Sequence, residues 1–324
     1  MITAMLRRLG LAALLGAALG APAAAAQPAY PAGPIRLVVP FATGGGTDVV
    51  SRVLAKELTS SLGKTVFVDN KPGANGTIGT MSAMQAAPDG YTLLLAIEAT
   101  VAINPGLYKY VKYRPGDFEA ISLVSKQPYL IVANPALKAN TLAELVAQAK
   151  AEPGKLNYAT GASAAFLAGE LFKSTASVDI GNVPYKGSGE AITDVLGGRV
   201  ELMVASPVSV MPQIKSGKLK VLAVTSAHRY ALLPQVPTVA EQGYPGFDAE
   251  GWYGLVAPKG TPANIVEILN AKIAAAMQSP ELQAQFQTAG VEPANSGSAE
   301  FADYMRSESA RWEGVIKQAG IEPQ

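Results

Sequence analysis

The sequence contains no cysteine and one histidine, His228, among its 324 residues. The lack of cysteine excludes disulfides, thiol catalysis and cysteine-based metal sites. The sequence also lacks the clustered histidine and cysteine ligands that a zinc site needs. A serine hydrolase would depend on His228 as its histidine base, and no Gly-x-Ser-x-Gly turn surrounds a plausible nucleophile. An exported hydrolase remains an alternative that these residues disfavour, and we expect no catalytic residue, metal or cofactor.

Charge of either sign is also scarce. Charged residues make up 16% of the chain, and 26 basic side chains nearly balance 25 acidic ones. A nucleic-acid-binding protein needs a basic face, and a peripheral membrane protein commonly carries a polybasic patch. We therefore expect neither partner.

The N-terminus has the pattern of an export signal. Arg7 and Arg8 precede an apolar run over residues 9–19, and Ala24-Ala25-Ala26 has the small residues of a cleavage site. The run is shorter than the ~20 apolar residues of a membrane span. This order predicts a signal peptide over residues 1–26, cleavage near Ala26 and a periplasmic protein that starts at Gln27.

Apolar, β-branched runs alternate with amphipathic helical patterns through the rest of the chain. This alternation predicts an α/β protein with largely parallel sheets and helices on both faces. The expected strands cover residues 35–39, 66–68, 91–97, 129–133, 156–160, 183–185, 200–205, 219–225 and 253–256. The expected helices cover residues 49–62, 79–87, 141–151, 164–172, 189–196, 211–215, 262–278, 280–289 and 298–319.

A glycine-rich loop over residues 40–48 joins the first expected strand to the first expected helix. Glycines let backbone N–H groups crowd together, and the helix N-terminus adds unpaired donors and partial positive charge. Such a loop can seat an anion such as a carboxylate. It can equally be a tight turn without a ligand.

A second junction of this kind, over residues 161–163, follows a strand in the middle of the chain. Ligands of open α/β sheets bind at the carboxyl ends of strands, so two such junctions suggest two lobes with a ligand between them. We expect the chain to cross between lobes near residues 125–128 and again near residues 225–227. Lobe 1 would then comprise residues 27–126 and 226–324, with residues 127–225 inserted as lobe 2.

Many ordered segments resemble the Bug-type periplasmic substrate-binding proteins of tripartite tricarboxylate transporters. The resemblance extends over essentially the whole chain after the signal. The matching segments include residues 34–36, 40–48, 69–76, 88–94, 102–108, 183–187, 196–200, 217–219, 222–226, 233–238 and 257–262.

This resemblance implies a two-lobed binding protein of type II, a Venus flytrap, without enzymatic activity. It implies capture of a small aliphatic or aromatic carboxylate and delivery to membrane subunits of a tripartite transporter, by a protein that is a monomer by default. A sensor that presents its ligand to a membrane signalling partner is the alternative.

The resemblance also implies which residues bind the ligand. Those expected in lobe 1 are Phe41, Thr43, Gly44, Gly45, Asp48, Ala99 and Thr100. Those expected in lobe 2 are Thr160, Gly161, Ala162, Ser163, Phe166 and Ser206.

Four of these positions raise questions about specificity. An acid in the first turn of a helix suits the helix dipole, so Asp48 is expected to orient loop amides or waters. Phe166 replaces a histidine of many relatives and faces either the cleft or the core of its lobe. Glu98 faces either the cleft or solvent. Ser206 stands where many relatives have an acid, which weakens the case for an amino-acid ligand.

Overall fold

The computed structural model describes residues 30–324. The expected signal peptide, its cleavage near Ala26 and the start at Gln27 lie outside these residues. Within them, no helix has both the length and the apolar character that crossing a membrane requires. Residues 33–324 form one compact unit that contains two β-sheets.

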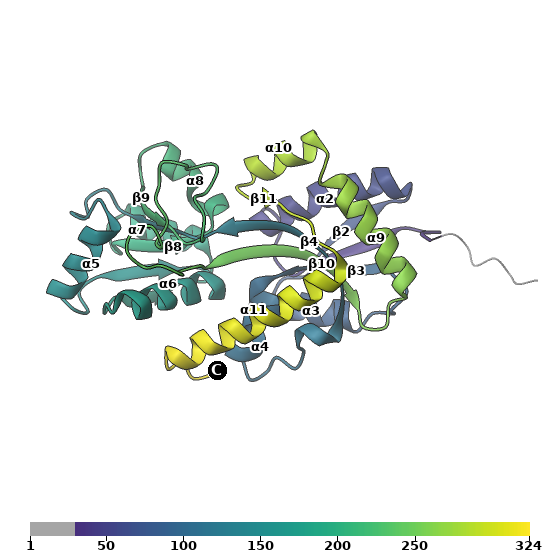
Figure 1. Cartoon of the computed structure of the whole chain (residues 1–324), viewed down its shortest axis with the longest axis horizontal. Helices are drawn as coiled ribbons and strands as arrows, with labels where there is room; N and C mark the ends of the chain where they lie inside the picture. Colours follow the sequence, from purple (N-terminus) through teal and green to yellow (C-terminus); the bar gives the residue numbers. More distant parts are fainter. Residues whose placement is uncertain (1–29) are drawn as a thin grey trace, which may run out of the picture. The chain divides into compact units, whose positions relative to one another are not determined.

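The first sheet has six strands in the order β11-β4-β10-β3-β1-β2. Helices α2, α9 and α10 lie on one face, and α3, α4 and α11 lie on the other (Figure 1). The strands are β1 (Ile35–Val39), β2 (Val66–Asn70), β3 (Thr92–Ile97), β4 (Phe118–Pro128), β10 (Glu250–Pro258) and β11 (Glu292–Pro293). The helices are α2 (Gly46–Leu62), α3 (Thr77–Met84), α4 (Asn104–Leu107), α9 (Ala263–Ala276), α10 (Pro280–Thr288) and α11 (Ser298–Gln318). Short 3-10 helices, η1 (Ala74–Gly76) and η3 (Pro115–Asp117), and a π-helix, η2 (Ala99–Ile103), complete this part.

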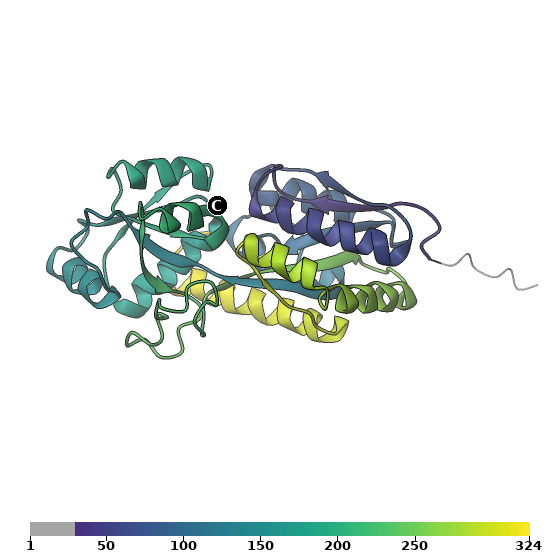
Figure 2. The ribbon, with the colours of Figure 1, turned by 90° about the horizontal axis from the view of Figure 1, so that it is seen from above.

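The second sheet has five strands in the order β7-β6-β8-β5-β9. Its strands are β5 (Leu130–Ala133), β6 (Asn157–Thr160), β7 (Gly181–Pro184), β8 (Leu202–Ala205) and β9 (Lys220–Val224). Its helices are α5 (Leu142–Ala151), α6 (Ser163–Ala176), α7 (Ser188–Leu196) and α8 (Pro207–Lys215). Figure 2 shows these helices grouped around the second sheet.

The sheets are mixed, whereas the sequence predicted largely parallel ones. Parallel pairing holds for β1 with β2 and β3, and for β6 with β7 and β8. Strand β10 is antiparallel to both β3 and β4, and β5 is antiparallel to both β8 and β9. One of the antiparallel partners is the long strand β4, which the sequence did not predict and which brings the chain out of the first sheet alongside β10 (Figure 1).

Each face of the second sheet has its own apolar core, because successive side chains of a strand point to opposite faces. Leu130 and Val132 of β5 pack in a cluster with Ala191 and Val195 of α7. Ile131, between them in the sequence, lies on the other face with side chains of α5 and α6. Both sides of this sheet are therefore closed by helices.

The two chain crossings between the sheets meet at Thr225, which is fully buried. Its Oγ1 accepts from the N–H of Tyr129 at 2.8 Å and donates to the carbonyl of Ala249 at 2.6 Å. Its own N–H donates to the carbonyl of Tyr129 at 3.0 Å. Residues Tyr129 and Ala249 border β4 and β10, so one threonine ties the outgoing segment to the returning one.

The segment between Thr225 and β10 packs on the second sheet. Tyr230, Leu233 and Val236 belong to the same core cluster as β5 and α7. Thr238 forms a parallel bridge with Val224 at the end of β9. Residues 230–238 therefore lie against the second sheet.

Gly254 lets β10 approach α11. A Cβ at this position would lie 2.0 Å from the ring of Phe301. We predict that Gly254→Ala lowers the free energy of unfolding by about 1–3 kcal/mol, because the core must move to admit the methyl group. Urea unfolding measures this.

The matched control is Gly314→Ala on α11, where the glycine is exposed and no atom lies within 4 Å of the added Cβ. Alanine there should raise stability by about 0.5–1 kcal/mol, because it is the better helix former. Equal effects of the two substitutions would contradict the packing described for Gly254.

Candidate ligand-binding cleft

A cavity of about 600 Å³ is lined by residues of both sheets. Small-molecule sites in proteins typically have volumes of ~300–1,000 Å³. The lining includes the N-terminal residues of four helices, α2, α6, α7 and α8. Strands β1, β6, β7 and β8 end just before these helices, so the cavity lies where open α/β sheets bind their ligands.

At all four helix N-termini the N-cap residue makes no side-chain hydrogen bond with the first-turn N–H groups, as is also true of α3, α9 and α11. The N-cap residues are Gly45, Ala162, Gly187 and Ser206, and all four line the cavity. Glycine and alanine have no oxygen to accept with, and the Ser206 hydroxyl pairs with the Ser209 hydroxyl at 3.1 Å. Unpaired N–H groups and the positive ends of four helix dipoles therefore converge on one space.

Asp48 shapes the glycine loop from behind. Its Oδ2 accepts from the N–H of Gly44 at 2.9 Å and from Arg52 Nε at 3.0 Å, and its Oδ1 accepts from Asn70 Nδ2 at 3.0 Å. Burial raises the pKa of Asp48, but the hydrogen bonds from Arg52, Gly44 and Asn70 outweigh burial and lower the pKa overall. The carboxylate thus stays ionised and orients the loop.

Asn70 completes this support. Its Nδ2 also donates to the carbonyl of Phe41 at 3.0 Å, and its Oδ1 accepts from the Thr43 hydroxyl at 3.2 Å. One amide at the end of β2 therefore holds the loop at Phe41, Thr43 and Asp48. This role of Asn70 was not expected from the sequence.

Eight of the thirteen expected site residues line the cavity. They are Phe41, Thr43, Gly45, Ala99, Gly161, Ala162, Ser163 and Ser206. Five others are not part of the lining: Gly44, Asp48, Thr100, Thr160 and Phe166. Their binding role stays a prediction, and their surroundings suggest support instead of direct contact.

Thr100 and Thr160 are buried behind the cavity wall. The Thr100 hydroxyl donates to the carbonyl of Ile97 at 3.1 Å, and Thr160 Oγ1 accepts from Asn182 Nδ2 at 3.0 Å. Phe166 is half-buried on α6. Gly44 has a φ of 90°, which favours glycine and aims its N–H at Asp48.

Gly161 brings two helix N-termini together. A Cβ at Gly161 would lie 2.3 Å from the backbone nitrogen of Ser188, the first residue of α7. Any larger residue would therefore push α7 away from α6. The glycine of the second junction is needed for this close approach.

Glu98 lies at the floor of the cavity and is 3% exposed. Its Oε1 accepts from the Tyr129 hydroxyl, and its Oε2 accepts from the N–H of Trp252 at 3.0 Å. Burial raises the pKa of Glu98 to about 7, against the smaller effects of these two hydrogen bonds. Of the two orientations that the sequence left open, the structure shows the one that faces the cleft.

Several lining residues were not expected from the sequence, among them Lys186, Gln127 and Tyr253. Gln127 Nε2 donates to the Tyr253 hydroxyl at 3.3 Å at the cavity floor. Lys186 is exposed and makes no ion pair with another residue of the described part. A signal was available for Lys186, because Tyr185-Lys186-Gly187 is a third glycine-containing junction between a strand and a helix.

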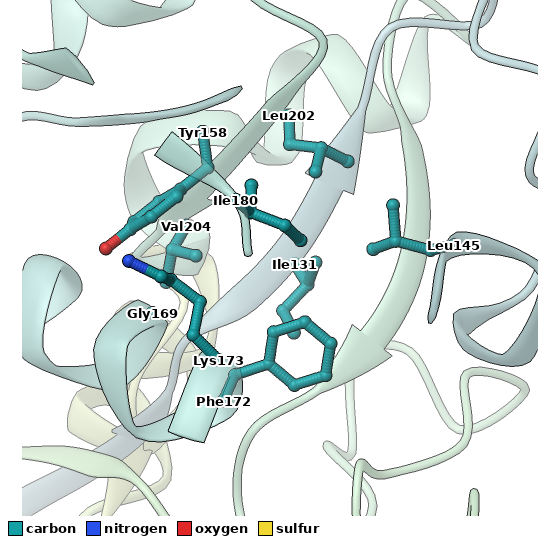
Figure 3. Close-up of a pocket in the computed structure, with 9 residues that line it drawn as sticks. All are labelled: Ile131, Leu145, Tyr158, Gly169, Phe172, Lys173, Ile180, Leu202 and Val204. Atoms are coloured by element: carbon teal, nitrogen blue, oxygen red, sulfur yellow. The ribbon is translucent and has the colours of Figure 1, made fainter. Parts of the chain in front are cut away.

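A second cavity, of about 10 Å³, lies inside the core between the second sheet and α6 (Figure 3). Apolar side chains such as Ile131, Phe172 and Val204 surround it, with the polar atoms of Tyr158 and Lys173 at one side (Figure 3). It has room for about one water molecule at most, so it is a packing gap and no ligand site.

Two mixed sheets with a cleft at the carboxyl ends of their strands define a two-lobed periplasmic binding protein of α/β class. Residues 50–321 match the tripartite tricarboxylate transporter family receptor, TctC, and the chain belongs to this family. It is a periplasmic solute-binding protein and not an enzyme, as the resemblance to Bug-type proteins implied.

Individual relatives agree over nearly the full chain. Protein BugT of Bordetella pertussis is 40% identical over 320 residues, which cover 98% of each chain. The structure of R. palustris Rpa4515 with adipate has a TM-score of 0.83 and 34% identity, and covers 91% of this chain and all of that one. MatC (Rpa3494) from Rhodopseudomonas palustris with bound malate has a TM-score of 0.77 and 31% identity, over 89% of this chain and all of that one.

The buried Glu98 predicts a specific pH dependence of stability. Its folded-state pKa of about 7 lies above the ordinary value of 4.5, so the folded state holds the proton more tightly than the unfolded state. The stabilisation of the folded state by protonated Glu98 is fully present below pH 4.5. It is lost as the pH rises to 7 and above, which lowers the free energy of unfolding by about 3 kcal/mol. Glu98→Gln should therefore gain stability relative to the wild type between pH 5 and pH 8.

Urea unfolding of both proteins at pH 5 and pH 8 measures this gain. Glu267→Gln, at an exposed position on α9, is the matched control and should follow the wild type at both values. A constant difference between Glu98→Gln and wild type across this range would contradict the buried, protonatable carboxyl.

Proposed function

We propose that this protein captures a small carboxylate anion in the cleft and delivers it to the membrane subunits of a tripartite tricarboxylate-type transporter. The observation that carries the proposal is the convergence of four uncapped helix N-termini on one cavity. Helix N-termini with free N–H groups are common sites for carboxylates and phosphates. The family and the acids bound by two relatives support the carboxylate.

A dicarboxylate suits the distribution of charge best. The Gly45 loop and α2 offer donors from the first sheet, while Ser188 of α7 and the unpaired Lys186 offer donors and positive charge from the second. A ligand with an anionic group at each end would use both walls. Adipate and malate, the ligands of the two R. palustris relatives, are acids of this kind.

A ligand that contacts both walls would also close the two lobes around it. Contacts to both lobes stabilise the closed form, because only a difference in affinity between two conformations shifts their equilibrium. The hinge would be the pair of crossings joined by Thr225. Lobe 2 would then comprise about residues 129–249, and the expected boundary at residue 225 would move with the segment that packs on the second sheet.

The same proposal includes export to the periplasm and docking on membrane subunits. A signal peptide over residues 1–26 would direct the chain to the periplasm, where it acts as a monomer. The closed, loaded form would dock on the membrane subunits, which the transport role requires.

Gly45→Val tests the site directly. The nearest atom to a Cβ at Gly45 is the Ala42 carbonyl oxygen at 3.7 Å, so a valine fits the fold while its methyl groups enter the cavity. We expect at least a 100-fold loss of affinity for dicarboxylates, because the ligand can no longer approach the N–H groups. Isothermal titration with succinate, malate, adipate and citrate measures this.

Gly297→Val is the matched control, since Gly297 is also an extended N-cap residue with free space but lies outside the cavity lining. The control should bind like the wild type. If folded Gly45→Val keeps wild-type affinity, or if no carboxylate of the panel binds the wild type, the proposed site or function is wrong.

A further inference from the structure

Glu98 is the one carboxyl side chain among the described residues that line the cavity. The four helix N-termini favour an anionic ligand, yet a buried acid faces the same space. Like charges in a site shielded from water repel strongly, because the local dielectric constant is low. An ionised Glu98 would therefore oppose the ligand that the rest of the cavity attracts.

The fold prevents Glu98 from moving out of the way. Tyr129 belongs to the outgoing crossing and Trp252 to the returning strand β10, and each donates to a different oxygen of Glu98. The Tyr129 backbone is itself tied to Thr225. The carboxyl is thus held from two sides in a 3% exposed position, and a change of protonation is the remaining way to relieve the repulsion.

The groups around Glu98 do not supply a compensating positive charge. Tyr129 and Tyr253 are buried phenols whose pKa values are raised, in both cases mainly by burial, so both stay neutral. Glu308 of α11 adds a further negative charge, which is paired with Arg311 at 2.8 Å. Lys186 lines the cavity from the second sheet, where the ligand would compete for it. Burial also raises the pKa of Glu98 to about 7, so little energy is needed to add a proton near neutral pH.

We propose that the cleft binds its carboxylate ligand together with one proton, which moves from solvent to a Glu98 carboxylate oxygen. This inference rests on the proposed function and adds its regulation by pH. No covalent bond of the ligand changes, and the proton returns to solvent when the ligand leaves. A neutral Glu98 removes the repulsion and keeps both hydrogen bonds, because a carboxylic acid still accepts on its two oxygens.

The direction of the pH effect identifies the ligand class. For an anion without an amino group, the pKa of Glu98 rises on binding, so affinity is highest below pH 7 and falls by up to tenfold per pH unit above it. A ligand that places an ammonium group at Glu98 would favour the ionised carboxylate, and its affinity would rise with pH. Glu98 therefore selects for acids that lack an amino group near the cavity floor.

The test is isothermal titration with adipate, malate and succinate at pH 7.5, in phosphate and in Tris buffers, whose ionisation enthalpies differ. The difference between the two apparent enthalpies gives the number of protons taken up. We expect an uptake between zero and one proton in the wild type, and no uptake in Glu98→Gln. The glutamine is isosteric, accepts from Trp252 and can donate to the Tyr129 hydroxyl oxygen.

The affinity of Glu98→Gln should be constant between pH 6.5 and pH 8.5, while that of the wild type falls. His228→Gln is the control, because it replaces the one histidine of the sequence, which is exposed and lies outside the cavity lining. It should keep the proton uptake of the wild type.

Binding without proton uptake, or with proton release, overturns the inference and leaves the proposed function intact. Failure of all three acids to bind the wild type counts against the proposed function itself, and the inference falls with it. Because the wild-type titrations alone give the proton count, the test stands even if Glu98→Gln does not fold.

Discussion

Unpaired backbone N–H groups at four helix N-termini are the constraint on which the rest of this structure depends. A serine, threonine, aspartate or asparagine cap can satisfy these groups, as Thr141 does for α5 by accepting from the N–H of Glu144. The four helices at the cleft have glycine, alanine or an otherwise engaged serine instead. A missing side-chain cap costs roughly a few tenths of a kcal/mol where the N-cap is glycine and about 1 kcal/mol where it is alanine, and a bound anion can offset this cost.

The supporting interactions follow from that constraint. A loop whose amides are free for a ligand must be held by other hydrogen bonds. Asp48 accepts from the N–H of Gly44, and Asn70 donates to the carbonyl of Phe41. Two N-termini can share a ligand only if they approach closely, and Gly161 allows this for α6 and α7. The floor is held by Glu98, whose partners Tyr129 and Trp252 lie on the two crossing segments. A few buried contacts therefore connect the ligand-binding cavity to the two segments that cross between the sheets.

Local patterns in the sequence predicted those parts of the site that local chemistry determines. The glycine loop and the 161–163 junction were expected from such patterns and Ser206 from the family resemblance, and residues of both segments line the cavity with Ser206. The spacing of Thr141 and Glu144 is typical of a capping box. Thr141 is the N-cap of α5 in the structure, and the Glu144 carboxylate accepts from the N–H of Asn140 and not from that of Thr141. These features depend on a few neighbouring residues.

Features that depend on distant partners were missed. Strand β4 contains Ser122, Ser125 and Gln127, which interrupt its apolar pattern, yet all three are buried. Ser122 pairs with the Ser296 carbonyl and Gln127 with Tyr253, more than 100 residues away. The packing of Tyr230 on the second sheet likewise depends on contacts that a linear pattern does not contain. Whether Phe166 or Glu98 faced the cleft was open for the same reason.

A crystal structure of the protein with adipate or malate would show whether the uncapped helix N-termini bind the ligand. We predict one ligand carboxylate within about 2.7–3.2 Å of backbone N–H groups at the start of α2, and the other end of the ligand at the N-termini of the second sheet's helices or at Lys186. A ligand bound in the cleft whose carboxylates avoid these N–H groups, or one bound elsewhere on the protein, would contradict this prediction.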